Sequence, residues 1–300
     1  MEVLFRPKHT IVSHTAAVYS VCAGRHSHSI FSASGDKFIA EWNVDTGQQE
    51  PLAVRLTQPV FAITHIEEEG LLVAGGANGT IEVIDIVHKK ELHNFSLHSK
   101  GVYDFYFDAA GEQLMALGGD GVLSVWSIPD FRLLHKIQLS NGKLRQIAFS
   151  EQYGLYAIAS ADGNVYLLNH DSMHIQRVIA AHHLGATSVA WHPTKPVLLS
   201  GGRDALLKVW NMTADYDLLM ELPAHNYAIY SIVFNESNTH LATGSRDKTI
   251  KVWNSVTMDV LQRLDIKTGG HSHSVNKLIW KGDALISVGD DRKIIVWEKQ

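Results

Sequence analysis

The sequence is poor in cysteine and lacks any long apolar segment. Its 300 residues include one cysteine, Cys22, which cannot form a disulfide within the chain and therefore favours a reducing compartment. No apolar run reaches the roughly 18 residues that a membrane-spanning helix needs, and residues 1–7 contain no apolar signal segment. We therefore expect a soluble, cytoplasmic protein with no membrane partner.

The chain also lacks an excess of positive charge. It has 26 Lys and Arg residues against 31 Asp and Glu residues, which gives a net charge of −5. Nucleic acids and anionic membranes attract proteins whose charge is of the opposite sign, so no general attraction to either is expected. A hydrophobic content of 45% excludes a disordered chain and is enough for a folded core.

A repeat of about 42 residues runs through the whole chain. Seven similar segments end in a Trp or aliphatic residue followed by a polar one: Trp42-Asn43, Ile84-Asp85, Trp126-Ser127, Leu168-Asn169, Trp210-Asn211, Trp253-Asn254 and Trp297-Glu298. The successive spacings are 42, 42, 42, 42, 43 and 44 residues. A fixed period of this length is the signature of a repeat architecture. We expect one domain over residues 1–300, with unit ends near 42, 84, 126, 168, 210, 253 and 297.

Each unit alternates apolar stretches with polar turns. In the sixth unit, Ile229 to Phe234 has the pattern of a buried strand, and further strands are expected over 241–245 and 250–253. The turn before the last strand of a unit often holds Asn-Gly or Asp-Gly, as at 78–79, 120–121 and 162–163. These dipeptides tolerate the positive φ angles of tight hairpins. No segment has a helical period, so the sequence predicts an all-β protein.

The period, the four strands per unit and the Trp-Asp-like dipeptide resemble WD-repeat (WD40) β-propellers. The similarity is strongest over residues 201–211 and 244–254. It implies a closed seven-bladed β-propeller with four antiparallel strands per blade. The seventh unit stops at Trp297, the end of its third strand, and residues 3–11 resemble outer-strand segments such as 132–139 and 218–222. We therefore expect the N-terminal strand to complete the last blade, which removes two exposed sheet edges.

Four units carry a His, a Ser or Thr, an Asp and a Trp at matching positions. These sets are His14, Ser32, Asp36 and Trp42; His182, Ser200, Asp204 and Trp210; His225, Thr243, Asp247 and Trp253; and His271, Ser287, Asp291 and Trp297. The third unit keeps His98, Asp120 and Trp126 but has Ala116 at the hydroxyl position. The second and fourth units lack the His and end in Ile84 and Leu168, so we expect more apolar packing and looser loops there.

A Ser, His and Asp together are also the parts of a hydrolase site. An enzyme needs one such set beside an oxyanion hole, whereas here the set recurs four times at the repeat period. We interpret each set as a hydrogen-bond chain within one blade, from Asp to His to Ser or Thr to the Trp N–H, which the family resemblance also implies. Such a chain satisfies buried polar groups and fixes the connecting loop to its blade.

Two short histidine motifs could suggest a metal site. His26 with His28, and His271 with His273, have the spacing that places two imidazoles on one face of a strand. No cysteine or nearby carboxylate completes either pair, and His271 already belongs to a predicted chain. We expect surface or turn histidines, Cys22 in the core without a basic neighbour, and neither a metal nor a cofactor.

The resemblance implies that partner-binding residues lie where each inner strand begins and just before the turn Asp, on one face of the ring. Units 1 to 3, with unit 6 taken as adjoining them, place four aromatic residues there: Tyr19, Phe61, Tyr103 and Tyr230. Units 4 to 6 place four basic residues there: Lys143, Arg145, Arg203 and Arg246. Tyr and Arg are enriched in interface hot spots. In the alternative interpretation, the tyrosines pack between blades and the arginines are only solvated.

We expect a non-enzymatic scaffold that binds a protein or peptide segment carrying an anionic group beside an apolar anchor. It would act as a monomeric propeller within a larger complex. One alternative is a propeller hydrolase, which requires carboxylates or histidines around the channel. Another is a nucleic-acid reader that touches phosphates with residues 143–246, although the overall charge opposes it.

Overall fold

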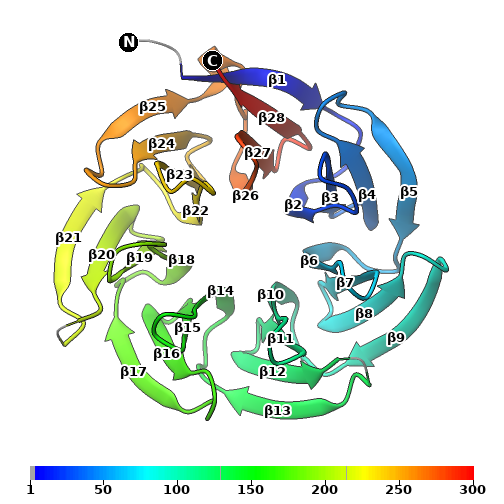
Figure 1. Cartoon of the computed structure of the whole chain (residues 1–300), viewed down its shortest axis with the longest axis horizontal. Coiled ribbons are helices and arrows are strands. Elements are labelled where there is room, and N and C mark those ends of the chain that lie inside the picture. Colours follow the sequence, from blue (N-terminus) through cyan, green and yellow to red (C-terminus); the bar gives the residue numbers. More distant parts are fainter. Residues whose placement is uncertain (1–3, 129, 214) are drawn as a thin grey trace.

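The computed structural model describes residues 4–128, 130–213 and 215–300, and these form almost exclusively β-structure. Twenty-eight strands make seven four-stranded sheets, arranged like the blades of a propeller around a central axis (Figure 1). The predicted seven-bladed all-β ring is confirmed. The exception to the all-β prediction is one short 3-10 helix, η1 (Ile266–Thr268). Within the described ranges, no helix is both long enough and apolar enough to cross a bilayer.

The four strands of each blade follow one another from the axis to the rim. Blades 1 and 2 contain β2 (Val18–Ala23), β3 (Ser29–Ser34), β4 (Phe38–Asn43), β5 (Gln49–Arg55), β6 (Val60–Ile66), β7 (Leu71–Gly76), β8 (Thr80–Asp85) and β9 (Lys90–Ser96). Blades 3 and 4 contain β10 (Val102–Asp108), β11 (Gln113–Gly118), β12 (Val122–Ser127), β13 (Leu133–Gln138), β14 (Leu144–Ser150), β15 (Leu155–Ser160), β16 (Asn164–Asn169) and β17 (Ile175–Ala180).

The remaining three blades repeat this order, except that the last one recruits the N-terminus. Blades 5 and 6 contain β18 (Ala186–Trp191), β19 (Val197–Gly202), β20 (Leu206–Asn211), β21 (Leu218–Pro223), β22 (Ile229–Phe234), β23 (His240–Ser245), β24 (Ile250–Asn254) and β25 (Val260–Leu264). Blade 7 contains β26 (Val275–Lys281), β27 (Ala284–Gly289), β28 (Ile294–Lys299) and, on its outer edge, β1 (Phe5–Ile11).

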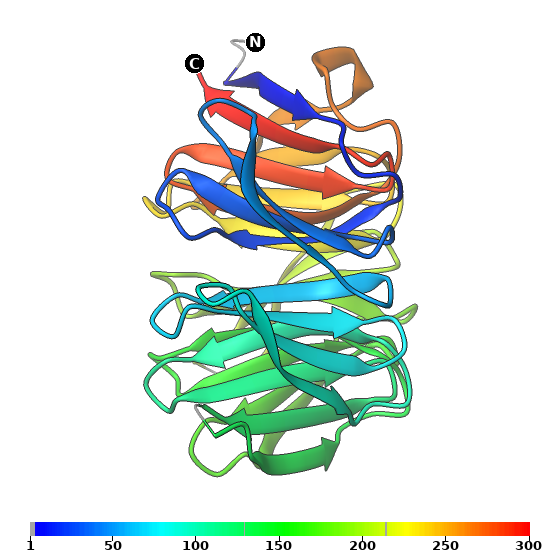
Figure 2. The ribbon, with the colours of Figure 1, turned by 90° about the vertical axis from the view of Figure 1, so that its right-hand side faces the viewer.

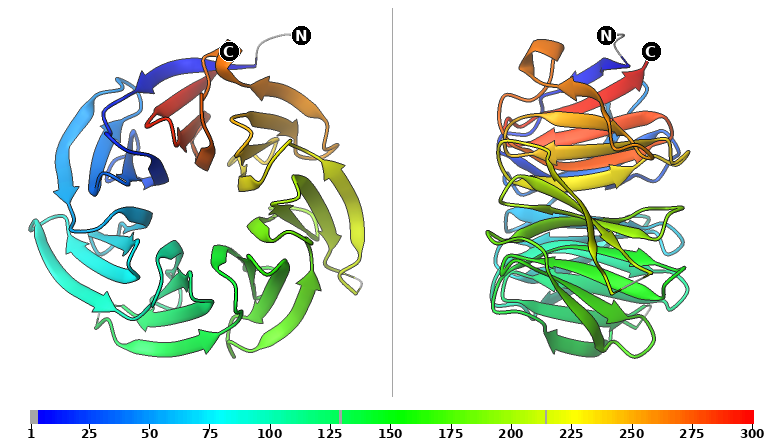
Figure 3. Two further views of the ribbon diagram at one scale, coloured as in Figure 1. Left: turned by 180° about the vertical axis from the view of Figure 1, so that it is seen from behind. Right: turned by 90° about the vertical axis from the view of Figure 1, so that its left-hand side faces the viewer.

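The ring closes through β1, as the sequence predicts. This strand pairs antiparallel with β28, from Phe5 opposite Lys299 to Ile11 opposite Ile294. The Phe5 side chain is 1% exposed, and its backbone N–H and C=O bond to the Gln262 side chain at 2.8 and 2.9 Å. Val3, the expected start of the strand, lies outside the described residues. The first described strand, β1, therefore lies beside the last strand, β28, in blade 7 (Figures 1 and 3).

The core is divided among the blade interfaces. Buried apolar side chains form seven clusters, each shared by two neighbouring blades. The cluster between blades 7 and 1, for example, joins Ile11 of β1 to Trp42 and Val296. Burying one such side chain contributes about 1.5–3 kcal/mol, so each blade depends on both of its neighbours for stability.

Loops gather on two opposite faces of the disc (Figure 2). One face carries both the connections from an outer strand to the next inner strand and the turns between the second and third strands of a blade. Backbone hydrogen bonds tie these two sets together, as from Gly119 N to Gly101 O at 2.8 Å and from Arg203 N to Gly185 O at 2.9 Å. We call this the mouth face.

The turns on the mouth face have the backbone conformation that the sequence predicts. Gly79, Gly121 and Gly163 have φ angles of 91°, 81° and 100°. A side chain at Gly121 would also collide with the backbone of Ser140 on the adjacent connection. Glycine is therefore required at this turn both for its positive φ and for the close approach of the two loops.

Candidate functional site

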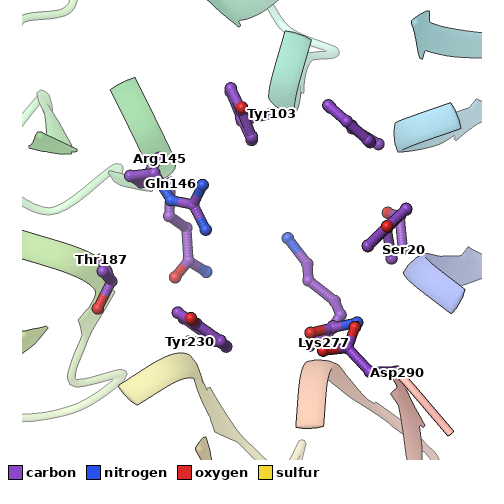
Figure 4. A pocket seen from close by; sticks show the side chains of 11 residues that line it. Ser20, Tyr103, Arg145, Gln146, Thr187, Tyr230, Lys277 and Asp290 are labelled. Carbon is purple, nitrogen blue, oxygen red and sulfur yellow. The ribbon is translucent and has the colours of Figure 1, made fainter. Parts of the chain in front are cut away.

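A cavity of about 270 Å³ opens at the centre of the mouth face, and we call it the pit (Figure 4). Every blade contributes to its wall. The lining residues are Tyr19, Ser20, Phe61, Tyr103, Arg145, Gln146, Thr187, Tyr230, Asn276, Lys277 and Asp290.

A β-bulge directs one side chain of each blade into this pit. In all seven blades the pairing between the first and second strands skips one residue at the start of the inner strand. The skipped residues are Tyr19, Phe61, Tyr103, Arg145, Thr187, Tyr230 and Asn276. A bulge leaves its extra residue unpaired and re-aims that side chain. The bulges explain why residues at the same repeat position converge around the channel.

Three aromatic rings form a continuous wall along blades 1 to 3. The rings of Tyr19 and Phe61 meet edge to face with centroids 5.1 Å apart, and those of Phe61 and Tyr103 stack at 5.4 Å. All three residues are half-buried. The aromatic wall, defined as these three residues, therefore offers apolar surface to a ligand in the pit while its rings support one another.

Arg145 lies next to this wall, between two tyrosines. Its guanidinium carbon is 4.7 Å from the Tyr103 ring centre and 5.9 Å from that of Tyr230. Burial lowers the pKa of Arg145 from its ordinary value, but an arginine remains charged at neutral pH. Among the described residues, no acceptor forms a hydrogen bond or an ion pair with this side chain. The result is a cation held by ring faces, with its N–H groups free.

A second hollow, of about 360 Å³, adjoins the pit above blades 3 to 6. Its wall includes four exposed cations, which we call the basic shelf: Lys100, Lys143, Arg203 and Arg246. Lys143 Nζ donates a hydrogen bond to the Tyr103 hydroxyl at 3.0 Å, so it links the shelf to the aromatic wall. No carboxylate of the described ranges lies within ion-pair distance of any shelf residue. The shelf therefore presents uncompensated positive charge.

The pit has a charged floor. Lys277 reaches from blade 7 across the channel to blade 3, where its Nζ lies 2.8 Å from Asp104 Oδ1. Both residues lie one position deeper on their inner strands than the residues of the rim. The other oxygen of Asp104 accepts a hydrogen bond from Ile147 N at 3.1 Å. Figure 4 shows the Lys277 side chain extending into the channel, and its ion pair with Asp104 closes the floor of the pit.

Among the described residues that line the pit and the second hollow, the acidic one is Asp290 of blade 7. Asp290 is exposed and accepts a hydrogen bond from Asn276 Nδ2 at 2.8 Å. Burial and the nearby carboxylate of Asp290 raise the pKa of Tyr19. The mouth thus has an acidic side at blade 7 and a basic side at blades 3 to 6.

The structure places all eight predicted partner-binding residues at this mouth, but one detail of their arrangement is wrong. Blade 6 does not adjoin blade 1, because blade 7 lies between them. Tyr230 therefore stands apart from the aromatic wall and packs against Arg145 instead. The sequence analysis missed Lys277 and Asp104, which neighbour the predicted positions, because only the bulge brings two consecutive residues to the channel.

The predicted hydrogen-bond chains are present in blades 1, 5, 6 and 7. In blade 1, His14 Nδ1 donates to Asp36 at 2.9 Å, its Nε2 accepts from the Ser32 hydroxyl at 2.8 Å, and Trp42 Nε1 donates to that hydroxyl at 2.8 Å. The corresponding distances in the other three blades lie between 2.8 and 3.0 Å.

These chains do not form an exposed reactive site. Ser32, Ser200, Thr243 and Ser287 are all 0% exposed, so no substrate can reach their hydroxyls. In blade 6, burial alone would raise the pKa of Asp247, but hydrogen bonds from His225, Thr249 and Asn226 outweigh it and hold that pKa well below its usual range. The carboxylate is therefore a charged acceptor at neutral pH.

Blade 3 completes its chain with a residue that the sequence analysis did not identify. Ser124 accepts a hydrogen bond from Trp126 Nε1 and donates one to His98 Nε2, both at 3.0 Å. It is the cross-strand neighbour of Ala116, the residue at the usual hydroxyl position. In blade 3 the hydroxyl therefore comes from the adjacent strand, and it occupies the usual place between the His and the Trp.

Blade 4 has the expected apolar packing at Leu168, which is buried in a cluster shared with blade 3, but it also keeps a polar chain. Ser140 occupies the histidine position and donates to Asp162 at 2.6 Å, while Ser160 donates to Ser140 at 2.9 Å. Tyr166 donates to the same Asp162 at 2.7 Å. Blade 2 is apolar as expected, since Leu56, Ala74 and Ile84 occupy the corresponding positions in one buried cluster.

The histidine pairs do not gather further ligands. The rings of His26 and His28 stack at 5.5 Å, and His271 is bonded within blade 7. Within the described ranges, no group of three His, Cys, Asp or Glu residues could hold a metal ion. Burial raises the pKa of the Cys22 thiol to about 12, although Lys277 and Lys281 lie near it. The expectation that Cys22 has no basic neighbour is therefore wrong.

A polar cluster on the opposite face was also missed. His170 Nε2 lies 2.9 Å from Asp108 of blade 3, and its Nδ1 lies 2.8 Å from Asp171. Hydrogen bonds to Asp171 and to Asp108 raise the pKa of His170 despite partial burial. This cluster joins blades 3 and 4 and lies on the far side of the disc from the pit.

The family model of the WD domain, G-beta repeat, matches residues 5–43, 89–127, 173–211 and 216–254, slightly more than half of the chain. Each match runs from an outer strand to the third strand of the next blade. The first three strands of blades 2, 4 and 7 lie outside the matched residues. The chain is also similar to three longer proteins. The human GATOR2 complex protein WDR24 is 26% identical over 207 residues, which is 66% of this chain and 25% of the relative.

The other two relatives come from Rattus norvegicus. WD repeat-containing protein 55 is 23% identical over 209 residues, covering 70% of this chain and 53% of the relative. Apoptotic protease-activating factor 1 is 25% identical over 210 residues, covering 67% of this chain and 16% of the relative. The chain therefore spans less than two thirds of each of these relatives.

Proposed function

Because the chain belongs to the WD40 family of WD domain, G-beta repeat proteins, we propose that it is a protein-interaction module. Its mouth face binds a peptide or protein segment. The observation that carries this proposal is the union of the pit with the basic shelf. The aromatic wall and the unpaired Arg145 lie beside four further cations in one continuous depression.

The charge of this depression determines the class of partner. The shelf cations have no carboxylate partners among the described residues, so they are free to pair with anionic groups of a partner. Arginine binds carboxylates through two parallel hydrogen bonds, and the aromatic wall accepts an apolar side chain. The partner segment is therefore acidic and carries an apolar anchor.

The proposal includes no catalytic role. The Ser–His–Asp sets are buried within the blades, and Lys277 and Asp104, the charged pair of the floor, are already bonded to each other. A nucleic-acid partner is the second candidate, and the basic shelf is the feature that favours it. Binding to heparin and to single-stranded RNA at two salt concentrations tests it, because phosphate-dominated binding weakens steeply as salt rises.

We further propose that one copy of the propeller works inside a larger, cytoplasmic assembly. The name of one relative places that relative in the GATOR2 complex, and the raised pKa of Cys22 is compatible with a reduced thiol in the core. Light scattering of the purified chain should give the mass of a monomer.

Capture of partners from a native lysate tests the mouth directly. The double variant Arg203→Glu/Arg246→Glu should lose the proteins that the unmodified chain captures. The matched control is Lys89→Glu/Lys90→Glu, two exposed lysines at the start of β9 on the opposite face, and this variant should retain the captured proteins. Equal capture by both variants, with equal melting temperatures, contradicts the proposal.

A variant of the aromatic wall separates binding from stability. Tyr103→Ala should weaken binding by on the order of 2 kcal/mol if this side chain is a hot spot, with little salt dependence. If it instead only lowers the melting temperature while the Arg203/Arg246 double variant binds normally, the tyrosine merely packs between blades and the proposal falls.

A further inference from the structure

Resting on the proposed function, we infer that the pit takes the C-terminal residue of the partner chain. The α-carboxylate of that residue binds the guanidinium of Arg145. Its side chain lies against the aromatic wall. The residues before it then cross the rim and lie over the basic shelf.

The Arg145 side chain provides a binding site for an anion inside the pit. The guanidinium carbon lies 4.7 Å from the Tyr103 ring centre and 5.9 Å from that of Tyr230, and no acceptor among the described residues bonds to the group. Cation–π contacts of this kind leave the N–H donors unused. A planar guanidinium matches the two oxygens of a carboxylate. The geometry therefore provides one anion subsite inside the pit, separate from the shelf.

The anion subsite at Arg145 lies close to the apolar subsite, which is the aromatic wall. The Tyr103 ring contacts both, since its centre is 4.7 Å from the Arg145 guanidinium carbon and 5.4 Å from the centre of the Phe61 ring. The two subsites are thus about one residue apart. An internal Asp or Glu offers an anion without an apolar group, and an internal Leu or Phe offers the reverse. A chain terminus carries both on one residue.

The pit is small and is closed at its floor. Its volume of about 270 Å³ lies just below the range of pockets that enclose a whole drug-sized ligand. It therefore suits a single anchoring residue. The ion pair between Lys277 and Asp104 crosses the channel beneath it, so a chain cannot continue through the ring. A segment that enters from the mouth face must end there.

The residues before the C-terminus of the partner leave the pit toward the basic shelf. The basic shelf adjoins the pit at Arg145, Thr187 and Tyr230. A chain that ends in the pit can leave it only across the rim, and the uncompensated cations lie on the side of blades 3 to 6. Acidic residues upstream of the terminus are therefore favoured over basic ones.

The test compares peptides that differ only at their ends. The probes are fluorescent nine-residue peptides with Glu-rich upstream positions and a terminal Leu or Phe. Each is made with a free carboxylate, as the amide, and with two glycines added after the apolar residue. Fluorescence anisotropy against the full chain should show at least tenfold weaker binding for the amide and for the extended peptide, because a buried charged hydrogen-bond partner is lost.

Two variants assign the effect to the pit. Arg145→Gln should bind the free acid and the amide equally, which a purely structural role for Arg145 would not produce. Phe61→Ala should weaken both forms while the preference for the free acid persists. Thermal melts of both variants check that the ring is intact, and Lys89→Glu/Lys90→Glu serves as the control on the opposite face.

Several results would overturn the inference. If the amide and the extended peptide bind as tightly as the acid, and this binding needs Arg203 and Arg246, the mouth reads internal segments and only the C-terminal assignment fails. If N-acetyl-leucine alone binds as tightly as the peptides, the pit holds a small carboxylate rather than a chain end. If partner capture ignores every mouth variant, the proposed function itself fails.

Discussion

The chain of blade 6 gives the sharpest stability prediction. Asp247 accepts hydrogen bonds from His225 Nδ1, from Asn226 N and from Thr249 N, each at 3.0 Å, and from the Thr249 hydroxyl at 2.6 Å. Asp247→Ala removes all four acceptor contacts and leaves Nδ1 of the buried His225 with only the Thr249 hydroxyl, 3.2 Å away. Losing the partner of a buried polar group costs about 1–3 kcal/mol, so the free energy of unfolding should fall by that amount at pH 7.

The pH dependence of this effect has a definite sign. Hydrogen bonds to its charged form hold the pKa of Asp247 below its usual value, so folding favours the carboxylate. The stabilisation is complete above the unfolded pKa of about 4 and is lost as the pH falls through the lower pKa of the folded state. The difference between the original chain and Asp247→Ala should therefore be full at pH 7 and shrink as the pH falls below about 4.

Urea unfolding at several pH values measures both quantities. Asp247→Asn keeps an acceptor oxygen without the charge and should lie between the original chain and Asp247→Ala. Asp283→Ala changes an exposed carboxylate in a turn of the opposite face and should have no effect. A fully stable Asp247→Ala variant that lost only a catalytic activity would refute the structural interpretation of these chains.

Three further predictions concern blade 3, ring closure and the shelf. Ser124→Ala should cost about 1 kcal/mol in urea unfolding, and adding Ala116→Ser should restore part of it; no rescue would contradict the exchange of the hydroxyl between strands. Phe5→Ala should cost about 3–5 kcal/mol, and deletion of residues 1–8 should cause self-association in light scattering, whereas a monomer with an unchanged melting temperature argues against closure through β1. Arg203→Glu/Arg246→Glu should slow association with an acidic peptide, with a loss that shrinks as salt rises; a salt-independent loss points to misfolding instead.

The sequence predicts the fold because its informative residues recur. Five units end in Trp and three carry an Asn-Gly or Asp-Gly turn, so each of the seven units has at least one of the two signals and a local error does not change the ring. The repeat also predicts the mouth residues, because Tyr19, Phe61, Tyr103 and Arg145 fall at one repeat position.

The missed features depend on contacts between elements far apart in the sequence. Lys277 and Asp104 meet across the channel, and their pairing has no counterpart in the repeat pattern. Ser124 supplies from β12 the hydroxyl that blades 1, 5, 6 and 7 carry on their second strand, where blade 3 has Ala116. Tyr230 shares its aromatic character with the residues of blades 1 to 3, but blade 7 separates its blade from blade 1 in the ring. An alignment of repeats compares equivalent positions only, so it does not detect a residue on a neighbouring strand that takes over the same role, as Ser124 does.

Hydrogen–deuterium exchange of the chain with and without its captured partner tests the central claim most directly. The account predicts protection at the starts of β2, β6, β10 and β14 and in the turns around residues 119–121, 161–163 and 203–205, all of which border the pit or the shelf. Protection confined to the opposite-face loops near residues 67–70 and 151–154, or to the outer strands β17 and β21, would contradict it.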